Sequence, residues 1–157
     1  KLRTSLSTMI GAVPGALPPL IGWAAVTGSV AGPEPWTLFL IGFIWQLPHV
    51  LAISWMYRED YARAGFPLLP VLDKHGGPTG RQMVLWSTML IPFSLLPVLY
   101  GMAGSVYAIG ALVLGIAQAV LAVGFLRRRS TPDARKLFYA TIVYLPLLWI
   151  LMAASRQ

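Results

Sequence analysis

Residues 36–57 read WTLFLIGFIWQLPHVLAISWMY, a long apolar run with a few polar residues in it. A helix needs about 20 apolar residues to cross roughly 30 Å of hydrocarbon, and this run is long enough. Its polar residues Gln46 and His49 fall near the middle of the expected span. Because polar and ionisable groups are costly to hold in hydrocarbon, both side chains are candidates for a functional site.

The composition of the whole chain agrees with a membrane protein. Of its 157 residues, 57% are apolar and only 11% are charged, and the mean hydropathy is +0.69. Soluble domains have about 45–50% apolar residues and about 25% charged ones. The absence of cysteine excludes disulfides and thiolate metal sites. No secretory signal pattern precedes the first span, and the start at Lys1 indicates a processed or truncated beginning.

Five apolar stretches predict an all-α polytopic membrane helix bundle with five transmembrane helices. Prolines at positions 14, 18 and 19 are expected to kink or locally unwind the first span. Gly11 and Gly15 form a GxxxG pair, which indicates close helix packing. The chain is expected to be part of a single membrane domain, with one long cytoplasmic loop at residues 58–82. The predicted spans are residues 6–27, 36–57, 83–102, 106–126 and 137–154.

Basic residues predict the orientation of these spans. Eleven of the 12 Lys and Arg residues fall on one side of the predicted membrane, and Arg156 alone falls on the other. By the positive-inside rule, the basic side faces the cytoplasm, or the matrix if the membrane is mitochondrial. The net charge of +7 comes from short clusters between spans, which favours membrane topology over nucleic-acid binding. The run Arg127 to Arg129 is read first as a topology signal that faces anionic headgroups.

One helical stripe connects the middle of the second span to the cytoplasmic charges. At 3.6 residues per turn, and with a helix that continues past the proline, the stripe contains Gln46, His49, Ile53, Tyr57 and Asp60. A polar centre with a charged mouth predicts a cavity for an amphiphilic substrate. The apolar middle of the 58–82 loop would lie in the interface and act as a lid.

Each candidate also has a structural interpretation. His49 could bond to a helix carbonyl or to Gln118 instead of lining a substrate cavity. Glu59 and Asp60 could pair with Arg58 or Arg63 in a solvated cluster. Tryptophans at the span ends suit an aromatic belt at the membrane interface.

A magnesium site is the sharper hypothesis for the acidic pair. Mg²⁺ typically joins one or two carboxylates to substrate phosphates, while arginine binds the remaining phosphate oxygens. Asp60 beside Arg58 and Arg63 offers both kinds of group. With only five acidic residues in the chain, further ligands for a diphosphate site are missing.

Three long motifs resemble one known family. Residues 45–49 read WQLPH, residues 58–67 read REDYARAGFP, and residues 11–23 read GAVPGALPPLIGW. They closely resemble the protohaem IX farnesyltransferases, a family of UbiA-type intramembrane prenyltransferases, and the similarity covers essentially the whole chain. The resemblance implies an all-helical fold with nine membrane spans around a central cavity.

The resemblance also implies a reaction. Members of that family transfer a farnesyl group from farnesyl diphosphate to a vinyl group of haem B, with Mg²⁺, and the product is haem O. They carry an earlier Asn- and Asp-containing motif that has no counterpart in this chain. The chain therefore resembles the last five spans of nine, and without the N-terminal half it is expected to be inactive.

The family's functional residues carry over to matching positions of this sequence. Asp60, together with Glu59, would hold Mg²⁺ and diphosphate, and Arg58 and Arg63 would neutralise the departing diphosphate. Many relatives have a carboxylate four residues after the first one, where this chain has Ala64, so a second direct ligand from this loop is in doubt.

The remaining candidates would contact the organic parts of the substrates. Trp45, Tyr57 and Tyr61 would line the cavity and shield a carbocation from water. Gln46 and His49 would contact haem or orient its vinyl group. The implied location is the bacterial inner membrane, or the mitochondrial inner membrane in a eukaryote. Half of a transporter, or a membrane scaffold, stays open as an alternative function.

Overall fold

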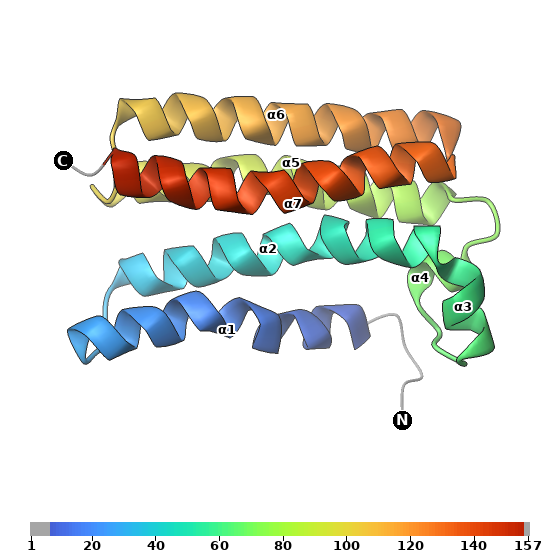
Figure 1. The fold of residues 1–157 in the computed structure, drawn as a ribbon, viewed down its shortest axis with the longest axis horizontal. Coiled ribbons are helices and arrows are strands. Elements are labelled where there is room, and N and C mark those ends of the chain that lie inside the picture. Colours follow the sequence, from blue (N-terminus) through green and yellow to red (C-terminus); the bar gives the residue numbers. More distant parts are fainter. Residues whose placement is uncertain (1–6, 156–157) are drawn as a thin grey trace.

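All regular secondary structure in the part of the chain that the structure describes is helical. The computed structural model describes residues 7–155, with side chains from residue 11 onward. This result confirms the predicted all-α membrane helix bundle. The helices are α1 (Ser7–Thr27), α2 (Pro33–Met56), α3 (Arg58–Arg63), α4 (Leu69–Leu72), α5 (Gly77–Leu99), α6 (Ser105–Arg128) and α7 (Thr131–Ala154) (Figure 1).

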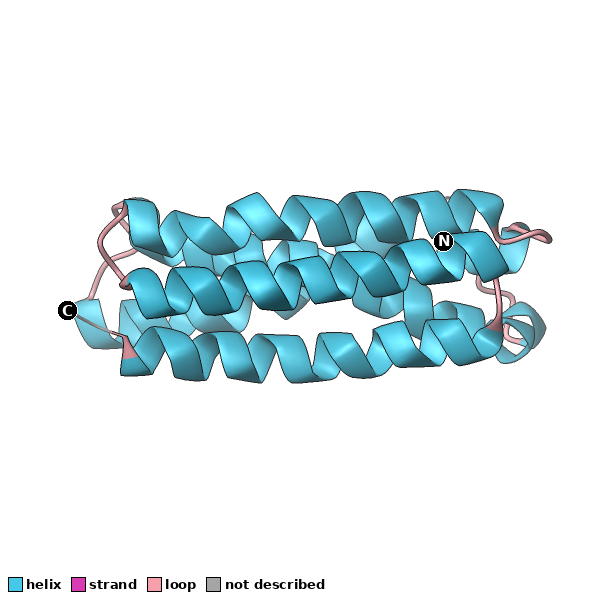
Figure 2. Cartoon of the chain, turned by 90° about the horizontal axis from the view of Figure 1, so that it is seen from above, coloured by secondary structure: helices cyan, strands magenta, loops and turns pink. Residues whose placement is uncertain are grey.

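Four long helices form a bundle, and a fifth lies on its outside. Helix α2 packs on α5 and α7, and α6 closes the ring by packing on the same two helices. Among the described residues, α1 contacts α2 alone of the other helices. The five long helices run side by side along the molecule (Figures 1 and 2). The short helices α3 and α4 lie together at the end where α2 stops and α5 begins.

Four helices of the described residues are long and apolar enough to cross a membrane. They are α2, α5, α6 and α7. The sequence predicted five spans; α1 forms as a helix of 21 residues but is not one of these four, so the fifth span stays a prediction. Helix α1 continues unbroken through its three prolines, so the expected local unwinding does not occur there.

Basic side chains gather at one end of the bundle. Lys1, Arg3 and Arg156 lie outside the described residues, and the other nine of the 12 Lys and Arg residues all lie near the end that carries α3 and α4. The arrangement is the one that the positive-inside rule requires of a cytoplasmic face.

Helix α5 begins earlier than the sequence predicted, at Gly77 instead of residue 83. The Asp73 carboxylate accepts hydrogen bonds from the backbone N–H groups of Gly76 (2.8 Å) and Thr79 (2.8 Å), which the first turn of a helix leaves unpaired. Gly76 has φ +74°, and a Cβ there would lie 2.7 Å from the Trp55 ring. A glycine and a capping carboxylate therefore extend the helix into the predicted loop.

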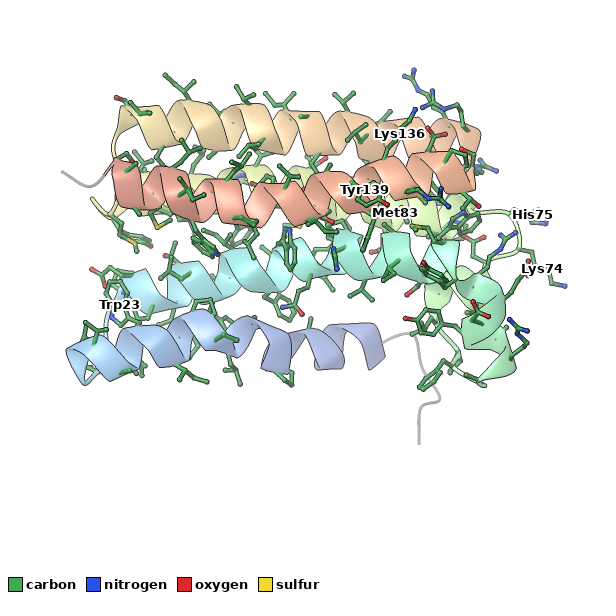
Figure 3. The ribbon with its side chains drawn as sticks, in the orientation of Figure 1. Trp23, Lys74, His75, Met83, Lys136 and Tyr139 are labelled. Atoms are coloured by element: carbon green, nitrogen blue, oxygen red, sulfur yellow. The ribbon has the colours of Figure 1, made fainter. Side chains whose placement is uncertain are left out.

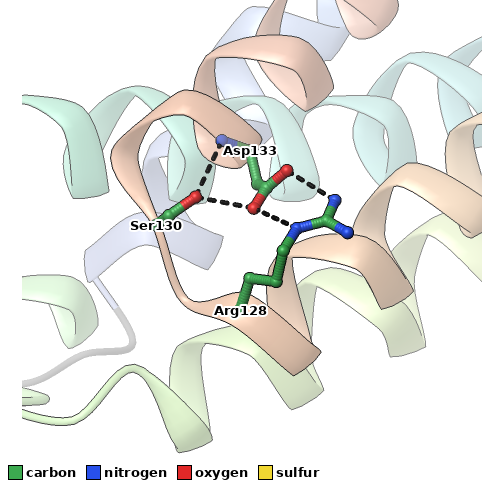
Figure 4. A network of polar contacts seen from close by, with 3 residues as sticks. All are labelled: Arg128, Ser130 and Asp133. Atoms are coloured by element: carbon green, nitrogen blue, oxygen red, sulfur yellow. Dashed lines mark hydrogen bonds and ion pairs between the residues drawn. The ribbon is translucent and has the colours of Figure 1, made fainter.

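Helix α7 also begins early, at Thr131, because of a polar network at its first turn (Figure 4). Ser130 is the N-cap, and its hydroxyl accepts from the Asp133 N–H and donates to the Asp133 carboxylate at 2.6 Å. The same carboxylate accepts two hydrogen bonds from Arg128, at 2.7 and 2.6 Å. Asp133 is 5% exposed, so its charge is neutralised where α6 turns into α7.

Polar side chains form a layer in the middle of the bundle. Gly80 packs on Leu126, and Gly115 packs on Ile91, so α5 and α6 are antiparallel and Ser87 lies nearly opposite Gln118. Both side chains are buried, at 0% and 1% exposed. Within the described part of the chain, neither the Ser87 hydroxyl nor the two polar atoms of the Gln118 amide have a hydrogen-bond partner.

The unpaired amide of Gln118 yields a stability prediction. A buried polar group without a partner costs about 1–3 kcal/mol, so Gln118→Leu should raise the melting temperature of the purified protein or leave it unchanged. The matched control is Gln46→Leu, because the Gln46 amide donates to the carbonyls of Ala12 and Gly42, both at 3.3 Å. The control should lower the melting temperature. A clear loss of stability in Gln118→Leu would show instead that a water or another group satisfies this amide.

Candidate functional site

The chain changes direction at the basic end of the bundle, between α2 and α3. Tyr57 has φ −112° and ψ 25°, which ends α2 at Met56, and α3 starts afresh at Arg58. The expected continuous stripe from Gln46 to Asp60 is therefore wrong, because α2 survives Pro48 but stops before the charged segment. The break separates the charged segment from the polar middle of α2.

A cavity of about 290 Å³ lies where α3 and α4 meet the chain that leads into α5. Its lining contains two cations, Arg58 and Lys74, and two carboxylates, Glu59 and Asp73. Figure 3 places Lys74 and His75 at the same end of the molecule as α3. The remaining lining residues are Ala62, Pro70 and Val71. The structure thus brings two of the predicted site residues, Arg58 and Glu59, to one concave surface.

Arg58 is oriented by a buried aromatic side chain. Its guanidinium carbon lies 4.6 Å from the centre of the Trp55 ring, within the range of a cation–π contact. Trp55 is 4% exposed, and its ring meets Phe125 edge-on with centroids 5.1 Å apart. The packed core therefore supports the cation that faces the cavity.

Asp60 and Arg63 face elsewhere. They form an ion pair with each other one turn apart on α3, and their side chains are 59% and 78% exposed. Neither residue lines the cavity. An exposed pair of this kind contributes about 0–1 kcal/mol, so it is a solvated cluster on the outer face of α3, as the second interpretation of the acidic pair expected.

Asp73 lines the cavity but is occupied as a helix cap. Burial alone would raise the pKa of its carboxyl group, but hydrogen bonds from Thr79, Gly76 and His75 outweigh burial and hold the pKa below its ordinary value. A carboxylate committed to three backbone N–H groups has little capacity left for a metal ion. Asp73 thus fixes the chain that leads into α5, and this chain forms part of the cavity wall. Glu59 is the other carboxylate of the lining and the one that could bind a ligand.

His49 and Trp45 lie half-buried between α2 and α7, away from this cavity. His49 Nδ1 is 2.8 Å from the Thr141 hydroxyl, and the Trp45 indole donates to the Thr141 carbonyl at 2.7 Å. The His49 ring is stacked between Trp45 and Phe138, with centroids 4.8 and 4.9 Å apart. Of the alternatives for His49, bonding to a protein partner is observed, but the partner is Thr141 rather than Gln118.

The other predicted contact residues are dispersed. Gln46 bonds toward α1, on a different side of α2 from the contacts of His49. Tyr57 is 50% exposed at the end of α2. Tyr61 packs edge-on against Phe66, with centroids 6.2 Å apart. These residues do not form one cluster with Arg58 and Glu59.

Two residues of interest were not found from the sequence. Lys74 reaches the cavity because α4 packs against both α2 and α3. No local sequence pattern predicts this packing. Thr141 holds both His49 and Trp45 from a helix more than 90 positions further along the chain. Within residues 7–155, no group of three His, Asp or Glu side chains is placed to hold a metal ion alone.

Comparison with known proteins identifies the family to which this chain belongs. The UbiA prenyltransferase family matches residues 1–153, and this chain belongs to that family. The residues that carried the resemblance therefore pointed to the right family.

Individual relatives are more specific. The chain is 47% identical over 156 residues to the protoheme IX farnesyltransferase of Solibacter usitatus (strain Ellin6076), which covers 99% of this chain and 53% of that protein. It is 46% identical over 147 residues to the enzyme of the same name from Opitutus terrae, covering 90% of this chain and 48% of that protein. The chain thus spans about half the length of these curated relatives. No solved structure gives a significant match.

The cap formed by Asp73 predicts a pH-dependent stability. Because the pKa of Asp73 is lower in the folded protein, its charge stabilises the fold above its unfolded pKa of about 4 and ceases to do so as the pH falls through the folded value. At neutral pH, Asp73→Asn should reduce the free energy of unfolding by about 1 kcal/mol. Thermal unfolding between pH 3 and pH 7 measures the difference.

The exposed Asp60→Asn is the matched control and should leave unfolding nearly unchanged. A difference between wild type and Asp73→Asn that persists unchanged at the lowest pH would show that the cap does not depend on the carboxylate charge.

Proposed function

We propose that the protein to which this chain belongs transfers a farnesyl group from farnesyl diphosphate to a vinyl group of haem B, with haem O as the product. The observation that carries the proposal is the cavity with Arg58, Lys74 and Glu59, at the basic end of a membrane bundle of the UbiA family. The printed names of the relatives supply the substrates. By the same relatives, which are bacterial, the location is the inner membrane.

The cavity suits the diphosphate end of the donor. Two cations on one concave surface offer charge-assisted hydrogen bonds to phosphate oxygens, and the Arg58 fork suits bidentate contact. As the allylic C–O bond breaks, its electron pair leaves with the diphosphate, and Arg58 and Lys74 would stabilise that growing charge. Arg63, which pairs with Asp60 on the outer face of α3, is proposed as a secondary cation for the diphosphate.

A magnesium ion fits this site when it is shared with the substrate. Glu59 lines the cavity, whereas Asp60, the next residue on α3, would have to leave its pair with Arg63 to reach the ion. Mg²⁺ is commonly held by one or two carboxylates together with phosphate oxygens. Bound there, the ion would neutralise part of the diphosphate charge. Further ligands would come from the half of the family's length that this chain does not span.

The apolar part of the reaction belongs in the membrane. The farnesyl chain would extend from the cavity into the bilayer, where carbon C1 would form a bond with one carbon of the haem vinyl group and leave a cation on the other. Water would then add to that cation and lose a proton, which gives the hydroxyl of the product. Tyr57 and Tyr61 are next to the cavity in sequence and are proposed to shield C1 from early attack by water. Trp45, Gln46 and His49 are proposed to contact the haem side.

Replacement of the cavity arginine tests the proposal. The chain is joined to the part of the Solibacter usitatus relative that it does not match, and haem O formation from farnesyl diphosphate, haem B and Mg²⁺ is followed by chromatography. Arg58→Gln should lower kcat/KM for farnesyl diphosphate about a hundredfold, because one preorganised cation is lost. Arg63→Gln should cost less, since Arg63 does not line the cavity.

The matched control is Arg81→Gln, which removes an equal charge at the same end of the bundle from an exposed side chain outside the cavity. It should keep full activity. Equal losses in all three variants would assign the effect to surface charge, and no loss in Arg58→Gln would place the diphosphate elsewhere.

The 157-residue chain by itself is expected to form no haem O. Its cavity supplies only part of a diphosphate site, so membranes that contain only this chain should release no diphosphate from farnesyl diphosphate in the presence of haem B. Turnover by this chain without a partner would contradict the proposal of a shared site.

A further inference from the structure

A second concave surface lies on the bundle, separate from the proposed diphosphate site. It is an apolar groove of about 540 Å³ along α6, with a contribution from α5. The lining is aliphatic except at one end, where arginines stand. The residues of this α6 groove are Ile91, Ile116, Ala119, Val120, Leu121, Val123, Gly124, Arg127 and Arg128.

The α6 groove has the length of one bilayer leaflet. Its residues Ile116, Val120, Val123 and Arg127 recur at intervals of three and four, so they share one face of the helix. At 1.5 Å per residue, the distance along the helix from Ile116 to Arg127 is about 16 Å. Half of a hydrocarbon core about 30 Å thick is about 15 Å. A chain that begins at the arginine would therefore end near the middle of the bilayer.

This surface faces outward in the bundle. Ile116 and Val120 are 52% and 63% exposed, and α6 lies on the opposite side of the bundle from α1 (Figure 1). Because α6 is one of the helices apolar enough to span a membrane, and no other described element packs on this face, we expect these exposed aliphatic side chains to face lipid. The groove thus opens toward acyl chains rather than toward the core.

The three consecutive arginines at the end of α6 differ in what they contact. Arg128 is held by Asp133 through two hydrogen bonds (Figure 4). Arg129, which has φ +53°, donates to the carbonyls of Leu126 and His75. Among the described residues, Arg127 has no carboxylate partner and no side-chain hydrogen bond. Arg127, the arginine without a partner, is therefore also the one that shares a helix face with the aliphatic lining of the groove.

We propose that the α6 groove binds one anionic phospholipid of the cytoplasmic leaflet. The phosphate would bind to Arg127, and one acyl chain would lie along Val123, Val120 and Ile116. Two observations favour a lipid over a second protein surface. The length of the groove matches the thickness of one leaflet, and Arg127, which has no partner among the described residues, lies at the end where the headgroups would be. Cytoplasmic leaflets are rich in anionic lipid, and each nearby basic residue strengthens the attraction. The site is independent of the proposed transferase activity.

Native mass spectrometry of the detergent-purified chain tests the headgroup contact. Phosphatidylglycerol and phosphatidylcholine with identical acyl chains are titrated in turn. We expect phosphatidylglycerol to bind more tightly, and Arg127→Gln to weaken its binding about fivefold with little effect on phosphatidylcholine. The matched control is Arg135→Gln, an exposed residue of α7 outside the groove, which should keep the preference.

Equal losses in Arg127→Gln and Arg135→Gln would overturn the proposal, because the preference would then come from diffuse surface charge. No preference for phosphatidylglycerol over phosphatidylcholine would overturn it as well. Pairs of chains that form without lipid and disappear in Arg127→Gln would identify the groove as a protein interface, which also contradicts the proposal.

A second pair of variants tests the acyl contact. Val120 and Val113 are both on α6 and are 63% and 62% exposed, but only Val120 lines the groove. Val120→Trp should fill the groove and reduce binding of long-chain phosphatidylglycerol, whereas Val113→Trp should not. Both side chains point away from the core, so neither change should lower the melting temperature. An equal effect of the two variants would show that no defined groove holds the acyl chain.

Discussion

Hydrocarbon offers no partner for a polar group, and this constraint shapes every part of the bundle. Backbone groups inside a membrane must be paired within the protein, so the spanning segments are helices. Gln46 and His49 follow the same rule, because Gln46 donates to carbonyls of α1 and α2 and His49 bonds to Thr141. The buried amide of Gln118 is an exception among the described residues. Charged residues are excluded from the middle, and all of those in the described part of the chain except Glu34 lie at the end that carries α3 and α4. The cavity lined by Arg58 and Lys74 lies at that end of the bundle.

The constraint explains why the fold could largely be predicted from the sequence. Long apolar runs showed where helices lie, and basic clusters showed which ends lie together. The beginnings of α5 and α7 were missed because hydropathy ignores the caps. Asp73 and Ser130 satisfy the first turns of these helices, so each begins in a polar segment that was assigned to a loop. The chain between α2 and α5 likewise contains two short helices, α3 and α4, that hydropathy did not indicate.

The candidate site was predicted less completely, because its geometry depends on tertiary packing. The motif at residues 58–67 contained Arg58 and Glu59, but the sequence left open whether Asp60 and Arg63 face a substrate or pair with each other, as they do on the outer face of α3. Lys74 joins the cavity through the packing of α4, which leaves no periodic signal. Nothing local to His49 selects Thr141 as its partner. The arginine run was read as a topology signal, and only the structure separates Arg127 from its two neighbours.

The hydrogen bond between His49 and Thr141 can form only late in the synthesis of the chain, because the two residues are 92 positions apart. Helices α1 and α2 pack on each other, and α5, α6 and α7 pack on their neighbours in the chain, so these contacts can form as each segment is made. Trp45 and His49 instead form their hydrogen bonds with Thr141 of α7, which is synthesised 96 and 92 positions later. At 5–20 residues per second, synthesis of that stretch takes on the order of ten seconds. During biogenesis the two aromatic side chains therefore remain without their native partner until the last helix arrives.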